Sequence, residues 1–94
     1  MSVTARSSEG LDPRRKRLLF RCWHRGIREM DLFMGSFANE TIAELSDAEL
    51  DQLEALLELP DLDVYADISG ARPLRPEYAG SVLDRLKTFR VPDL

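Results

Sequence analysis

The spacing of the apolar side chains constrains this chain more than any other feature of its sequence. They recur every three or four residues in short blocks, most clearly at Leu50, Leu53, Leu56 and Leu57. This spacing places apolar side chains along one side of an α-helix. No segment alternates apolar and polar residues in the way that a half-buried strand does. The sequence therefore predicts an all-α fold.

Proline, glycine and capping residues divide the chain into about five predicted helices. The sequence Ser46-Asp47-Ala48-Glu49 is a capping box, in which serine and glutamate satisfy each other's backbone N–H groups. The predicted helices run from Pro13 to His24 or Arg25, from Ile27 to about Asn39, from the capping box to Pro60, from an Asp61 cap to Gly70, and from Pro76 to Pro92. Their expected buried stripes include Ile27, Met30, Phe33, Met34 and Phe37, then Leu62, Tyr65 and Ile68, then Val82, Leu83, Leu86 and Phe89. Gly35, inside the second helix, is expected to permit close packing.

Length and composition favour a single small domain. With 94 residues the chain cannot divide into two independent cores. Residues 1–11 are predicted to be a disordered leader and residues 12–94 the helical domain. The single cysteine cannot form an internal disulfide, and no apolar run has the length of a secretory signal or a membrane span. We expect a cytoplasmic protein, since Glu9 and Asp12 make the N-terminus a poor organellar transit peptide.

Charge is sorted by segment along the chain. Residues 1–28 carry eight basic and two acidic side chains, residues 29–70 carry twelve acids and no Lys or Arg, and residues 71–94 carry five basic and three acidic side chains. The net charge of −4 argues against non-specific coating of nucleic acid. One side of the first helix is nevertheless basic, with Arg14, Arg17, Arg21 and Arg25 on a common arc. That arc is either a solvated face or a surface for an anion or a partner.

Residues 21–31, RCWHRGIREMD, gather the side chains that are most able to perform chemistry. Cys22 and His24 are two positions apart and so face different sides of a helix, which disfavours a nucleophile–base pair. Cys22 belongs to the apolar side and is expected to be buried. One histidine and one cysteine are too few ligands for zinc, and no phosphate-binding glycine loop is present. We therefore predict a recognition surface rather than an enzyme or a metal site, with Gly26 in a left-handed turn that another backbone can approach.

Arg25, Gly26 and Glu29 form an RGxxE motif, which is followed by the segment SDAELDQLEALLELPDLDVYADISG. Over about residues 14–90 the sequence resembles the succinate dehydrogenase assembly factors that promote flavin attachment. The resemblance implies a small helical, non-enzymatic protein that binds the flavoprotein subunit of succinate dehydrogenase, and by extension of fumarate reductase. It implies that the factor favours covalent bonding of FAD to a histidine of that subunit and leaves before the iron–sulfur subunit docks. It further implies that the factor holds no cofactor stably; we expect it to be a monomer when free, with no membrane or nucleic-acid partner.

The resemblance assigns partner binding to Arg25, Gly26 and Glu29, and we add their neighbours Arg21, Trp23, His24, Arg28 and Asp31 as candidates. Many family members have arginine where this chain has His24, so a charged contact there is expected to depend on pH. Three alternatives remain open. Gly26 could only end a helix, with Arg25 and Glu29 paired; Trp23 could stack on FAD in a flavin carrier; or the chain could bind nucleic acid through Arg14, Arg15, Lys16, Arg17 and Arg21.

Overall fold

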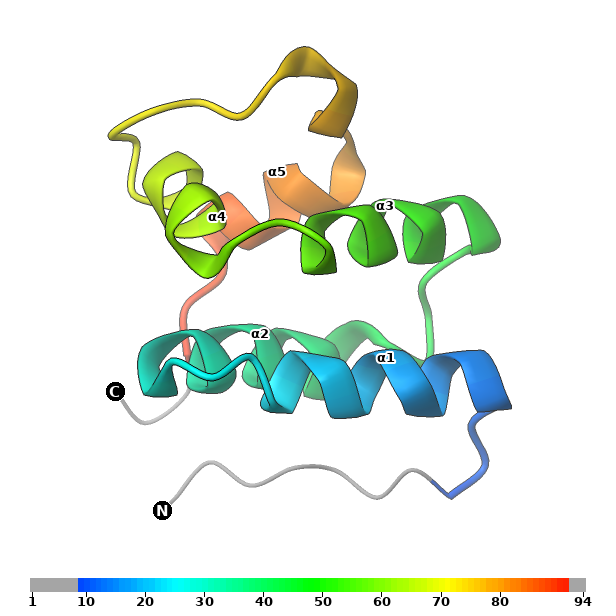
Figure 1. Cartoon of the computed structure of the whole chain (residues 1–94). Helices are drawn as coiled ribbons and strands as arrows, with labels where there is room; N and C mark the ends of the chain where they lie inside the picture. Colours follow the sequence, from blue (N-terminus) through cyan, green and yellow to red (C-terminus); the bar gives the residue numbers. More distant parts are fainter. Residues whose placement is uncertain (1–8, 92–94) are drawn as a thin grey trace. The chain divides into compact units, whose positions relative to one another are not determined.

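A computed structural model of the chain describes residues 9–91 and shows only helices and connecting segments there (Figure 1). The helices are α1 (Pro13–Trp23), α2 (Arg28–Thr41), α3 (Asp47–Leu57), α4 (Asp61–Ile68), the 3₁₀ helix η1 (Pro76–Tyr78) and α5 (Ser81–Thr88). The prediction of an all-α fold with about five helices is confirmed. The division into a disordered leader, residues 1–11, and one helical domain, residues 12–94, stays a prediction. Residues 1–8 of that leader lie outside the described part of the chain.

The chain divides into two compact units. Within the described part of the chain, one comprises residues 9–45 with 90–91 and contains α1 and α2; the other, Ser46–Phe89, contains α3, α4, η1 and α5. No helix within residues 9–91 combines the length and the apolar character needed to cross a bilayer.

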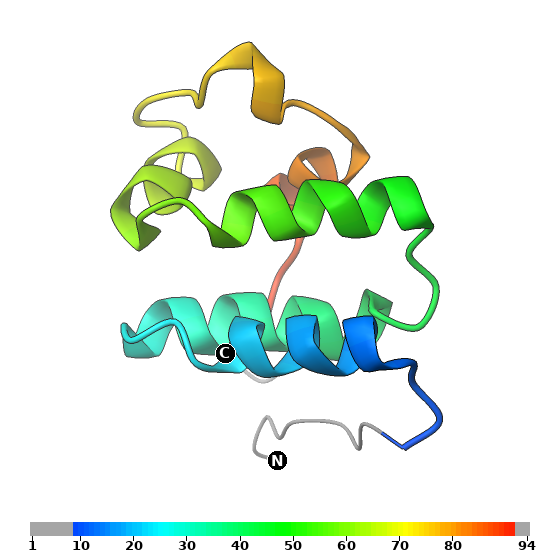
Figure 2. The same ribbon diagram turned by 45° about the vertical axis from the view of Figure 1, so that its right-hand side comes forward.

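In the first unit α1 and α2 lie side by side (Figures 1 and 2). Asp12 caps α1 as predicted, since its carboxylate accepts a hydrogen bond from the Arg15 N–H at 3.4 Å. The two helices contribute buried apolar side chains at helical spacing, although Phe33, which was also expected to be buried, is only half-buried. The buried side chains are Leu18, Leu19 and Cys22 of α1 and Met30, Met34, Phe37 and Ala38 of α2.

Arg15 joins the beginning of α1 to the end of α2. Its Nε donates to the carbonyl of Ile42 at 2.9 Å, one Nη donates to the carbonyl of Leu45 at 2.5 Å, and the other pairs with Asp12 at 2.8 Å. The carbonyls that follow a helix have no partner within it, so the guanidinium satisfies groups that would otherwise need water. Arg15 therefore stabilises the helix pair and is not a free cation on the basic side of α1.

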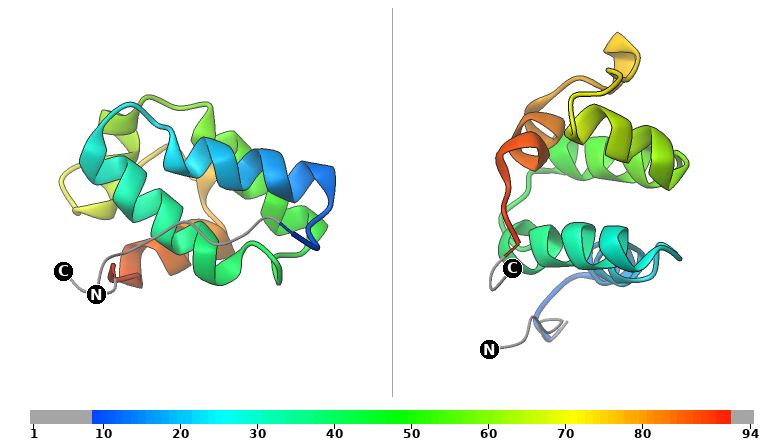
Figure 3. Two further views of the ribbon diagram at one scale, coloured as in Figure 1. Left: turned by 90° about the horizontal axis from the view of Figure 1, so that it is seen from below. Right: turned by 90° about the vertical axis from the view of Figure 1, so that its left-hand side faces the viewer.

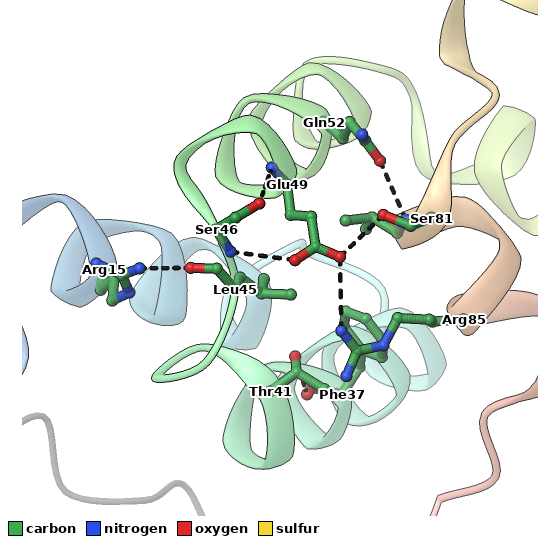
Figure 4. A network of polar contacts seen from close by, with 10 residues as sticks. Arg15, Phe37, Thr41, Leu45, Ser46, Glu49, Gln52, Ser81 and Arg85 are labelled. Atoms are coloured by element: carbon green, nitrogen blue, oxygen red, sulfur yellow. Dashed lines mark hydrogen bonds and ion pairs between the residues drawn. The ribbon is translucent and has the colours of Figure 1, made fainter.

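The second unit begins with the predicted capping box. The Ser46 N–H donates to Glu49 Oε1 at 3.1 Å, and the Glu49 N–H donates to Ser46 Oγ at 3.1 Å (Figure 4). The other Glu49 oxygen accepts from the Ser81 hydroxyl at 2.8 Å and lies 3.7 Å from Arg85. The capping box thus also connects α3 to α5, while the leucines of α3 are buried as predicted.

Helix α4 differs from its prediction in both its cap and its buried face. Asp61 is the first helical residue, and Pro60 occupies the capping position without a side-chain hydrogen bond. Leu62 and Tyr65 were expected to be buried, but they are 70% and 55% exposed, whereas Val64 and Asp67 are buried. The predicted stripe was wrong because the Asp67 carboxylate has internal partners, which turn that side of the short helix inward. Gly70 ends α4 as predicted, with φ at +83°.

The last predicted helix is two separate elements. Pro76 and Glu77 begin only the short helix η1, and α5 begins at Ser81. Gly80 lies against the Gln52 side chain, whose Oε1 accepts the Val82 N–H at 3.1 Å, and this contact sets the beginning of α5. Val82, Leu83 and Leu86 are buried as expected, while Phe89 follows the helix and is half-buried. The predicted stop at Pro92 lies outside the described residues.

Candidate functional site

The connection between α1 and α2, residues 24–27, carries the glycine of the RGxxE motif at one end of the helix pair (Figure 3). Gly26 has φ at +106°, which confirms the predicted left-handed turn. A Cβ built at Gly26 would have no heavy atom within 4 Å. The backbone conformation rather than crowding within this chain therefore requires glycine here, and the space beside its Cα is open.

The Asp31 carboxylate holds this turn. Its Oδ1 accepts the backbone N–H groups of Arg25 at 2.5 Å and of Gly26 at 3.1 Å. The Asp31 N–H donates to the carbonyl of Ile27 at 2.9 Å, which forms the first hydrogen bond of α2. Asp31 is half-buried. Asp31 is one of the candidate partner-binding residues, and its carboxylate binds two backbone groups of its own chain.

Four of the eight candidate partner-binding residues are exposed. His24, Gly26, Arg28 and Glu29 are exposed, whereas Arg21 and Arg25 are half-buried. Ile27 was predicted to begin the buried stripe of the second helix, but it is the N-cap of α2 and is 38% exposed. That part of the prediction was wrong, because the helical periodicity applies only after the turn, from Arg28 onward.

Trp23 is held within the helix pair. Its indole packs on Gly35, where an added Cβ would overlap the ring, and its Nε1 donates to Asn39 Oδ1 at 3.2 Å. The expected close approach at Gly35 is therefore confirmed, and the tryptophan is half-buried. An indole held in this way is a poor platform for stacking on a flavin, which weakens the flavin-carrier alternative.

Cys22 and His24 face apart as predicted. Cys22 is fully buried, and burial raises the pKa of its thiol to about 12 even though Arg25 and Arg21 oppose that shift. A thiol in this state is a poor nucleophile and a poor metal ligand. No group of three or more His, Cys, Asp or Glu side chains within residues 9–91 is arranged to hold a metal ion.

Sequence reasoning missed the partner of His24. The imidazole stacks on the Phe20 ring with centroids 3.9 Å apart, and its Nδ1 lies 2.7 Å from the Phe20 carbonyl oxygen. Because a carbonyl only accepts, Nδ1 carries the proton in this contact. Phe20 is 62% exposed and lies one helical turn before His24. The spacing of four residues between the two rings was the available signal.

A second candidate region is an open pocket of about 360 Å³ in the second unit, which Leu59, Tyr78, Arg72 and Arg75 help to line. Arg72 pairs with Asp63 and Arg75 with Glu77, each at 2.9 Å. Because both guanidinium groups already have carboxylate partners, an anion would have to compete with them. The turn between α1 and α2 is the better candidate for a binding surface.

Comparisons with known proteins identify the family of this chain. Residues 16–90 match the family described as the flavinator of succinate dehydrogenase. The mitochondrial succinate dehydrogenase assembly factor 2 of Danio rerio is 35% identical over 86 residues, which cover 89% of this chain and 54% of that protein. The corresponding protein of Mycosarcoma maydis is 35% identical over 81 residues, covering 86% of this chain and 34% of that protein.

A bacterial relative is covered more completely. The FAD assembly factor SdhE of Acetobacter pasteurianus is 34% identical over 85 residues, which cover 90% of this chain and 78% of that protein. By contrast, the chain spans only about a third to a half of the two mitochondrial proteins. The resemblance inferred from the sequence is confirmed, and this chain belongs to the family of flavinators of succinate dehydrogenase.

Proposed function

We propose that this chain is an assembly factor that binds the flavoprotein subunit of succinate dehydrogenase and promotes covalent attachment of FAD to it. The observation that carries the proposal is the exposed turn between α1 and α2, which presents Gly26 and Glu29 outside the apolar core. Membership of the flavinator family and the names of the bacterial and mitochondrial relatives support it. We extend the proposal to the homologous subunit of fumarate reductase.

The turn offers two kinds of contact to the flavoprotein. Arg25 in the turn and Glu29 in the first turn of α2 supply charged hydrogen-bonding groups. Gly26, with open space beside its Cα, lets a backbone of the partner come close. The factor itself forms no bond to flavin. It holds the flavoprotein in a state in which a histidine of that subunit bonds to FAD, and it leaves before the iron–sulfur subunit docks.

We propose that the chain holds no flavin stably and is a monomer when free. The Trp23 indole is already packed on Gly35 and bonded to Asn39, which supports the first point. Arg15, one of the five basic residues in the nucleic-acid alternative, binds carbonyls of its own unit, so that alternative gains no support. Relatives come from bacteria and from mitochondria, and we propose the bacterial cytoplasm for this chain.

The test mixes the chain with the FAD-free flavoprotein subunit and FAD, and measures covalently bound flavin by its fluorescence in a denaturing gel. We expect Glu29→Ala and Gly26→Arg to lower covalent flavin at least about tenfold, as loss of a charged or close-packed contact in an interface does. Circular dichroism should show nearly unchanged helix content.

Asp47→Ala is the matched control. It removes one exposed acid from the first turn of a helix in the other unit, and it should leave flavin attachment unchanged. Full flavin attachment by folded Glu29→Ala and Gly26→Arg proteins would reject this turn as the functional surface.

A further inference from the structure

The motif turn depends on a side chain that is not among the named positions of RGxxE. Arg25, Gly26 and Glu29 match those positions, whereas it is the carboxylate of Asp31 that accepts two backbone N–H groups of the turn. The inference below rests on the proposed function, since it concerns how that surface becomes ready to bind.

Asp31 joins the two ends of the turn in three hydrogen bonds. Its backbone N–H closes the first turn of α2 on the Ile27 carbonyl at 2.9 Å, and its Oδ1 accepts the N–H groups of Arg25 and Gly26 at 2.5 and 3.1 Å. Side chains in a helix lean toward its N-terminus, so a residue in the first turn is well placed to reach back over the preceding connection.

The arrangement suits an anion. Two successive backbone N–H groups converge on one carboxylate oxygen, as in the backbone concavities that bind anions. Gly26 contributes the positive φ that such a turn needs, at +106°. Arg25 and Gly26 are thus held from one side and Ile27 from the other by groups of this chain itself.

We propose that Asp31 is a positioning residue for partner binding: it holds the Arg25–Gly26 turn in its binding shape and is not itself a contact of the flavoprotein subunit. A preformed turn spares the complex the cost of ordering this segment on association. Loss of the carboxylate should therefore weaken binding without removing any group that touches the partner.

The test compares Asp31→Ala with Asp31→Asn. Asparagine keeps an acceptor oxygen at the same place but has no charge, so it can still accept both N–H groups. We expect Asp31→Ala to weaken binding to the flavoprotein subunit, measured by calorimetry, about tenfold. Asp31→Asn should stay within about threefold of the wild type.

A measurement on the free protein makes the test independent of binding. Solvent-exchange rates of the Arg25 and Gly26 amides, measured by NMR, should rise at least about tenfold in Asp31→Ala and much less in Asp31→Asn. The Leu50 amide in α3, which donates to the Ser46 carbonyl at 2.8 Å, is the internal reference and should not change. Asp47→Ala is the matched control for loss of an exposed acid and should alter neither binding nor exchange at Arg25 and Gly26.

Two outcomes overturn the inference. If Asp31→Asn binds as weakly as Asp31→Ala while its two amides stay protected, the negative charge itself contacts the partner. If Asp31→Ala binds as the wild type does, the turn needs no such support. The Glu29→Ala variant distinguishes these two outcomes from failure of the proposed function. If Glu29→Ala binds the flavoprotein subunit as tightly as the wild type does, the turn is rejected as a binding surface altogether.

Discussion

Two connections in this chain are each held by an aspartate, and the two aspartates lie in different surroundings. Asp31 accepts the N–H groups of Arg25 and Gly26 and is half-buried. In the second unit, Asp67 accepts the Leu74 N–H at 2.6 Å in the loop after α4 and is only 5% exposed. The other oxygen of Asp67 lies 3.2 Å from Lys87 Nζ on α5.

The difference shows that the same kind of interaction, an aspartate carboxylate that accepts backbone N–H groups, can serve two purposes. A carboxylate in the interior is costly unless it is paired and hydrogen-bonded, so Asp67 needs its partners for the unit to fold. For a carboxylate near water, losing its hydrogen-bond partners costs less free energy, because water molecules replace them. Asp67 thus supports the fold of its unit, whereas Asp31 determines the shape of an exposed turn.

The largest expected effect on stability comes from Asp67→Ala. It leaves the Leu74 N–H without its acceptor and Lys87 without its carboxylate, which should lower the free energy of unfolding by about 2–3 kcal/mol. Asp31→Ala should lower it by less than about 1 kcal/mol, although it weakens partner binding. Urea unfolding followed by circular dichroism measures both. Equal losses of stability would remove the distinction between the two aspartates.

A smaller effect separates two glycines of the first unit, Gly26 in the motif turn and Gly35 within α2. Gly35→Ala places a methyl group against the Trp23 ring and should destabilise the protein by about 2 kcal/mol, with a shift in tryptophan fluorescence. Gly26→Ala meets no neighbour and should cost about 1 kcal/mol through its positive φ alone. Thermal unfolding and emission spectra of the two variants check this order. A fluorescence shift in Gly26→Ala but not in Gly35→Ala would contradict the Trp23 packing.

The smallest effect concerns the half-buried carboxylate of Glu49, in the capping box of α3. The Ser46 N–H, followed by the Ser81 hydroxyl, holds the pKa of Glu49 below its ordinary value of 4.5. The stabilisation is present above that value and is lost as the pH falls through the lower pKa of the folded protein. Glu49→Gln should therefore weaken the acid dependence of unfolding. The measurement is the free energy of unfolding of the wild type and of Glu49→Gln across the acid pH range. Identical pH profiles of the two proteins would show that Glu49 has no such role.

The features that the sequence predicted correctly depend on neighbours along the chain. The Asp12 cap, the Ser46–Glu49 capping box and the left-handed Gly26 each involve residues no more than a few positions apart. The RGxxE motif was found in the same way, because it is a local string of residues. Helical periodicity also identified the buried leucines of α3 without any knowledge of what covers them.

The features that the sequence did not reveal depend on where another segment lies. Leu62 and Tyr65 have helical spacing, yet contacts of Asp67 with the loop after α4 and with α5 determine which side of α4 is buried. The short helix η1 is separate from α5, which begins where Gln52 of α3 accepts the Val82 N–H. Spacing along one helix carries no information about such contacts.

By itself the sequence determined the helices, their caps, the glycine turn and the family to which the chain belongs. The tertiary structure decided which charged groups remain available at the surface. Arg15 binds carbonyls 27 and 30 residues away, and Trp23 bonds to a residue 16 positions away, so neither contact follows from local pattern. Asp31 is close to the turn in sequence, but it reaches the two N–H groups only once Gly26 has turned the backbone. Backbone preferences act over a few residues, whereas the partner of a side chain is set by the folded path of the chain.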